Sequence, residues 1–121
     1  MTKLGESTIN DGTHNYTDYI RIKAQIFGRV QGVGFRGFAK RYGNALGLAG
    51  WVKNLYDGSI EIVAEGEKTK IEKYITLLEK GPTWARVDRI TVSRFKFKGD
   101  LDSFHVKYWY FMSYLIKLRC L

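Results

Sequence analysis

The chain has 121 residues, a length typical of one domain. Its hydrophobic content of 45% and aromatic content of 15% exclude a disordered chain. A formal net charge of +8 favours anionic partners, and the length excludes the two halves of a dinucleotide-binding fold. Residues 1–18 are rich in small polar residues without periodicity, which predicts a flexible N-terminal arm.

Alternating apolar residues predict a first strand, because period 2 places Ile20, Ile22, Ala24 and Ile26 on one face. A helix follows, since apolar residues recur at helical spacing before Gly47, namely Phe35, Phe38, Ala39, Tyr42 and Leu46. Residues 49–55 read as a second strand and 59–65 as a third. The pair Asp57-Gly58 between them favours a tight hairpin turn.

A second amphipathic helix is predicted over 67–80, stopped by Gly81 and Pro82. A fourth strand over 87–97 has imperfect alternation that indicates a bulge, and 104–108 forms a short fifth strand. The order is βαββαβ plus one strand. Since β-α-β crossovers are right-handed, we expect a ferredoxin-like α/β sandwich over 19–108. Its two helices cover one face of a four- to five-stranded antiparallel sheet.

Residues 109–121 form an apolar C-terminal extension that contains Lys117 and Arg119 and is too short to span a bilayer. We expect no membrane association. A monomer is the expected state, with a dimer through this tail as the alternative. The single cysteine, Cys120, excludes an intrachain disulfide. The lack of a disulfide and of an apolar leader-like run at the start of the sequence together favour a cytoplasmic location.

The turn between the first strand and the first helix is rich in glycine, with Gly32, Gly34 and Gly37 in a G-x-G-x-x-G pattern. A dinucleotide site is disfavoured because the second strand leads directly into an antiparallel partner. Backbone N–H groups of such a turn can instead hold a phosphate at the helix N-terminus, with Arg36 binding it in bidentate fashion. The alternative is a solvent-facing Arg36 with glycines needed only for turning.

Asn54 is the last residue before the end of the predicted second strand. The first and second strands end at the same end of the sheet. The Asn54 amide could orient a water beside a phosphate held near Arg36, or it could simply cap the hairpin turn. His14 lies in the predicted arm, and His105 reads as an exposed strand residue. No cluster of residues has metal-ligand spacing, so we expect no metal site.

Two stretches resemble the acylphosphatase family. Residues 28–36, GRVQGVGFR, are similar to its G-x-V-Q-G-V-x-F-R signature, and 50–61, GWVKNLYDGSIE, to G-x-V-x-N-x-x-D-G-x-V-E. The resemblance covers roughly 19–108 and implies hydrolysis of the carboxyl-phosphate bond of small acyl phosphates, without metal or cofactor. It implies that Arg36 binds the phosphate and Asn54 orients the attacking water. The implied phosphate-binding loop consists of Gln31, Gly32, Val33, Gly34 and Phe35.

The resemblance also implies that inorganic phosphate or another anion binds at this loop. The alternative is a ferredoxin-like domain that binds nucleic acid or regulates another protein without turnover. RNA-recognition domains of this fold need stacking aromatic residues on the third strand. Residues 59–65 contain none, so we expect no nucleic-acid partner.

Overall fold

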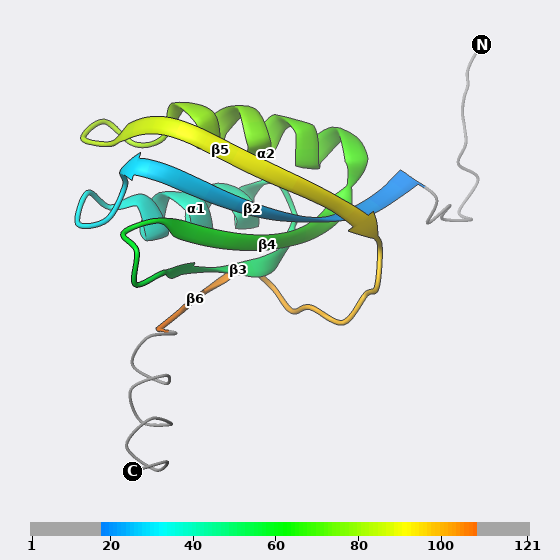
Figure 1. Cartoon of the computed structure of the whole chain (residues 1–121). Helices are drawn as coiled ribbons and strands as arrows, with labels where there is room; N and C mark the ends of the chain where they lie inside the picture. Colours follow the sequence, from blue (N-terminus) through cyan, green and yellow to red (C-terminus); the bar gives the residue numbers. More distant parts are fainter. Residues whose placement is uncertain (1–17, 109–121) are drawn as a thin grey trace.

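Alternating apolar residues build a five-stranded sheet in the computed structural model, which describes residues 18–108. The predictions for the arm up to residue 17 and for the extension 109–121 lie outside the described residues. The strands are β2 (Tyr19–Arg29), β3 (Ala49–Asn54), β4 (Ile60–Glu67), β5 (Arg86–Lys96) and β6 (His105–Lys107). The helices are α1 (Phe35–Ala45) and α2 (Lys68–Lys80), and both cover one face of the sheet (Figure 1).

The strand order is β5-β2-β4-β3-β6, as a ferredoxin-like sandwich with one added strand requires. The pairs β2–β4, β2–β5 and β3–β4 are antiparallel, as predicted. The prediction of an entirely antiparallel sheet is wrong for β6, which pairs parallel with β3. β5 ends at the same end of the sheet at which β3 begins, and the connection to β6 runs along that end (Figure 1). β6 therefore runs in the same direction as β3.

The predicted bulge in the fourth strand is confirmed. Phe27 pairs with Arg89 but Gly28 pairs with Val87, which leaves Asp88 as the extra residue of β5. Gly28 is required here, because its φ is 134° and an added Cβ would lie 2.1 Å from a backbone oxygen of β5. β2 therefore extends through residue 29, and the glycine-rich loop proper is confined to residues 30–34.

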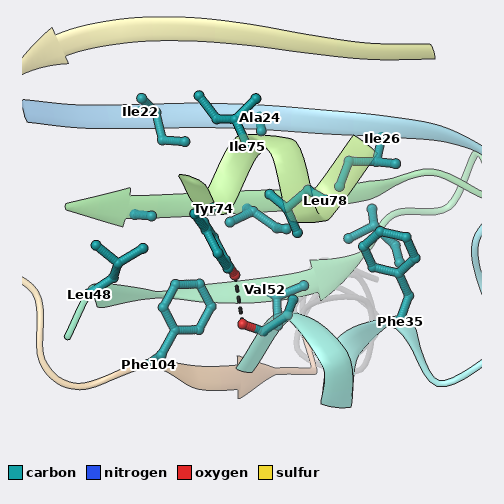
Figure 2. Close-up of a cluster of buried hydrophobic side chains, with 14 of the residues drawn as sticks. Ile22, Ala24, Ile26, Phe35, Leu48, Val52, Tyr74, Ile75, Leu78 and Phe104 are labelled. Carbon is teal, nitrogen blue, oxygen red and sulfur yellow. Dashed lines mark hydrogen bonds between the residues drawn. The ribbon is translucent and has the colours of Figure 1, made fainter. Parts of the chain in front are cut away.

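The core lies between the sheet and the two helices (Figure 2). Ile22, Ala24 and Ile26 of the predicted first-strand face are fully buried, while Ile20 is half-buried. Ile60, Ile62 and Ala64 of β4 are fully buried beside them. Tyr74 of α2 donates a 2.7 Å hydrogen bond to the carbonyl oxygen of Ala39 in α1, and burial raises the pKa of its phenol above the ordinary value. This bond joins the two helices.

Two glycines of α1 differ in what surrounds them. A Cβ on Gly43 would lie 2.5 Å from the buried ring of Phe104, whereas a Cβ on Gly37 would meet nothing within 4 Å. We expect Gly43→Ala to destabilise the fold by about 1–3 kcal/mol through overpacking. Gly37→Ala, the matched control, should stabilise it by about 0.5–1 kcal/mol. Urea unfolding of both variants measures this, and a Gly43→Ala variant as stable as the wild type would contradict it.

Candidate active site

The loop after β2 presents backbone amides at the start of α1. Gly32 and Gly34 adopt positive φ values of 74° and 82°, which explains why glycine is needed there. Gly34 is the N-cap of α1 and makes no side-chain capping bond, and the first turn of the helix holds no acidic residue. The first-turn N–H groups and the positive end of the helix dipole are therefore available to an anion.

Beside this loop lies a depression of about 390 Å³, which we call the cradle pocket. It brings together Arg36 from the first turn of α1 and Asn54 from the end of β3. Figure 1 shows the reason, since the β2–α1 connection and the β3–β4 turn lie at the same end of the sheet. The other residues that line the pocket are Val30, Gly32, Gly34, Phe35, Gly37, Lys40, Val106 and Tyr108.

Asn54 is only 6% exposed, and its side-chain Oδ1 has no hydrogen-bond partner among the described residues. Leaving a buried acceptor unpaired costs about 1–3 kcal/mol, so such an atom calls for a functional explanation. The hairpin turn is held instead by Asp57, whose carboxylate accepts bonds from the backbone N–H and hydroxyl of Ser59. These bonds lower the pKa of Asp57 below its ordinary value. Asn54 Oδ1 therefore does not cap the turn.

Arg36 is partly exposed and forms no ion pair with any residue in the range 18–108. Its guanidinium carbon lies 5.3 Å from the centroid of the Tyr108 ring, within the range of a cation–π contact. The contact restricts the arginine at the pocket wall and leaves its N–H groups without a competing carboxylate. A bidentate anion can therefore bind this guanidinium.

The residues of the predicted phosphate-binding loop fall into two groups: some line the pocket, and others anchor the loop to the rest of the fold. Gln31 is not among the residues that line the pocket, and its amide donates to the backbone oxygens of Leu55 (2.8 Å) and Ser59 (2.9 Å). Val33 packs against the core. Gly32, Gly34 and Phe35 line the pocket, although the Phe35 ring is buried. Gln31 therefore ties the loop to the hairpin that carries Asn54, and anion contacts fall to the backbone.

Three lining residues lie outside the glycine-rich stretch and the Asn54 motif that the sequence singled out. Lys40 follows Arg36 by four positions on α1, so helical spacing alone could have placed it on the same flank. Val106 and Tyr108 enter the pocket only because β6 pairs parallel with β3, and nothing in their local spacing signals that.

His105 pairs with Trp51 and is exposed on the sheet face opposite the helices. Its neighbour Val106 points toward the pocket, so the histidine lies on the other side of the sheet from Asn54. Within residues 18–108, no group of three or more His, Cys, Asp or Glu side chains could hold a metal ion. No helix in this range is long and apolar enough to cross a membrane.

Residues 22–106 match the family model described as Acylphosphatase. The chain is 43% identical over 89 residues to an acylphosphatase of Syntrophotalea carbinolica, covering 74% of this chain and 97% of that protein. It is 45% identical over 86 residues to an acylphosphatase of Thermus thermophilus, covering 71% and 97% respectively. The solved structure of an acylphosphatase from Coxiella burnetii is similar at a TM-score of 0.73 and 34% identity, covering 78% of this chain and 99% of that one.

Proposed function

This chain belongs to the acylphosphatase family and is a hydrolase of that class, and we propose that the cradle pocket is its active site. One observation carries the proposal. Arg36, whose guanidinium has no ion-pair partner within the described residues, the uncapped first turn of α1, and Asn54, whose amide oxygen is buried and unpaired, line a single pocket. Each of these groups is unsatisfied within the described residues, and a phosphate with its attacking water would satisfy all three.

The first part of the chemistry is phosphate binding. The N–H groups of loop 30–34 and the first turn of α1 bind the phosphoryl oxygens, and Arg36 holds two of them in bidentate fashion. Each such charge-assisted bond contributes about 1.5–3 kcal/mol. Because phosphoryl transfer needs mainly positioning and charge stabilisation, this set of donors supplies much of the catalysis.

The second part is the attack of water. Asn54 Oδ1 accepts a hydrogen bond from the water and directs its oxygen to phosphorus. The new phosphorus–oxygen bond forms while the bond to the acyl oxygen breaks, which releases a carboxylate and inorganic phosphate. The described residues that line the pocket include no carboxylate and no histidine. We therefore infer that a phosphate oxygen of the substrate accepts the proton.

The test is hydrolysis of benzoyl phosphate by the purified chain in the presence of a chelator. We expect turnover with inorganic phosphate as a competitive inhibitor. His105→Gln should leave kcat unchanged between about pH 6 and 8, because that side chain lies across the sheet from the pocket. Dependence of kcat on a group near pH 6.5 that disappears in this variant would contradict the role of the substrate phosphate.

Gln31 offers a test of how the loop is held. Replacing it with leucine removes both hydrogen bonds to the hairpin and leaves two carbonyls without this donor. We expect the free energy of unfolding to fall by about 1–2 kcal/mol. We also expect kcat/KM to fall about ten-fold, because the loop and Asn54 no longer keep their relative positions. Thermal unfolding and benzoyl phosphate kinetics measure the two effects. An unchanged kcat/KM would show that this tie does not serve the site.

The nucleic-acid alternative is disfavoured by the open face of the sheet. Lys23 and Lys53 both form ion pairs with Glu61, at 3.2 and 3.3 Å, and Arg21 pairs with the buried Glu65 at 3.2 Å. Carboxylates thus neutralise much of the positive charge that would contact nucleic-acid phosphates. We propose a monomeric enzyme, which sedimentation tests. A cytoplasmic location stays a prediction from sequence.

A further inference from the structure

Gly37 has no structural explanation within the described residues. Its φ is not in the left-handed region, and a Cβ there would meet nothing within 4 Å. This contrasts with Gly34, which needs its positive φ, and with Gly43, which makes room for Phe104. Glycine within a helix is unfavourable compared with alanine. The open space itself is therefore the feature to explain.

A second depression, of about 530 Å³, adjoins the cradle pocket across Gly34 and Gly37, and we call it the α1–α2 groove. The residues common to both depressions are these two glycines, so the ridge between them carries no side chain. The groove has apolar walls from both helices and the loop after α2, formed by Phe38, Tyr42, Leu77 and Pro82. Arg41 and Lys80 also line it.

The in-line geometry of the reaction places the acyl group on the side of α1 that faces the α1–α2 groove. In an in-line displacement, the attacking oxygen and the leaving oxygen lie on opposite sides of phosphorus. Asn54 orients the water from the flank of α1 that faces β3 and β6. The leaving group therefore departs toward the other flank, which faces α2 and contains the groove.

We propose that the α1–α2 groove is the binding site for the acyl group, and that Gly37 keeps the way to it open. The preferred substrates are then acyl phosphates with a bulky, apolar acyl group, such as a medium-length alkyl chain. This inference rests on the proposed function, since it requires phosphate to bind in the cradle pocket. The apolar walls bind the chain, and the rings of Phe38 and Tyr42, 4.8 Å apart, form a continuous surface for it.

The experiment compares kcat/KM for octanoyl phosphate and acetyl phosphate. In the wild type we expect octanoyl phosphate to be favoured by about ten-fold or more. Gly37→Leu should lower the octanoyl-to-acetyl ratio about ten-fold by closing the ridge. Leu77→Gln, on α2 and outside the cradle pocket, should raise KM for octanoyl phosphate about five-fold and leave acetyl phosphate unchanged.

Ala45→Leu is the control, since it places the same leucine side chain at an exposed position of α1 outside both depressions. It should leave the ratio as in the wild type. Equal use of the two substrates by the wild type would overturn this inference alone, as would an unchanged ratio in both Gly37→Leu and Leu77→Gln. Failure of the wild type to hydrolyse either substrate would overturn the proposed function, and this inference with it.

Discussion

Replacing Arg36 by glutamine is expected to raise KM for benzoyl phosphate by about 10- to 150-fold, with a smaller effect on kcat. The change removes a charge-assisted fork worth about 1.5–3 kcal/mol and leaves the backbone donors in place. The inhibition constant of inorganic phosphate should rise by a similar factor. Steady-state kinetics with phosphate as inhibitor measures both quantities in one series.

Two further substitutions separate this effect from a general loss of positive charge. Arg36→Lys keeps the charge but not the planar fork, so we expect intermediate values. Arg94→Gln removes an exposed arginine of β5 that pairs with Glu72 and does not line the cradle pocket. It should leave KM unchanged. If Arg36→Gln and Arg94→Gln behaved alike, the arginine would have no specific place in phosphate binding.

The second large effect is expected from Asn54→Ala, which should lower kcat by about 10²- to 10³-fold and leave KM nearly unchanged. The substitution removes the acceptor proposed to orient the water, and groups of this kind act mainly in the transition state. Because phosphate is held by other groups, the inhibition constant of inorganic phosphate should not move. This split between kcat and binding is the opposite of that expected for Arg36→Gln.

Asn44 provides a matched control for Asn54→Ala. It sits on α1 and its amide bonds both the backbone oxygen and the backbone N–H of Phe104, at 3.2 and 3.0 Å. Asn44→Ala should therefore lower the melting temperature with kcat unchanged. A kcat for Asn54→Ala within about two-fold of the wild type, in a chain that unfolds at the normal temperature, would remove this residue from the mechanism.

Much of the fold follows from local pattern. Within residues 18–108, apolar spacing and turn signals predicted the strands and helices, because burial of one face imposes periods of 2 and 3.6 directly on the sequence. The pair Asp57-Gly58 located the hairpin, and the broken alternation of the fourth strand indicated a bulge, which the structure places at Asp88. The two motifs around Arg36 and Asn54 pointed to the same end of the sheet, which their place in the βαβ order requires.

The sequence by itself thus determined the sandwich, its inner faces and the two residues that meet in the pocket. Only the tertiary structure decided which strand β6 joins, and with it the entry of Tyr108 into the pocket wall. It likewise decided that Gln31 braces the hairpin and that Gly37 borders open space. These features depend on contacts between segments far apart along the chain, and such contacts leave no period or spacing in the sequence.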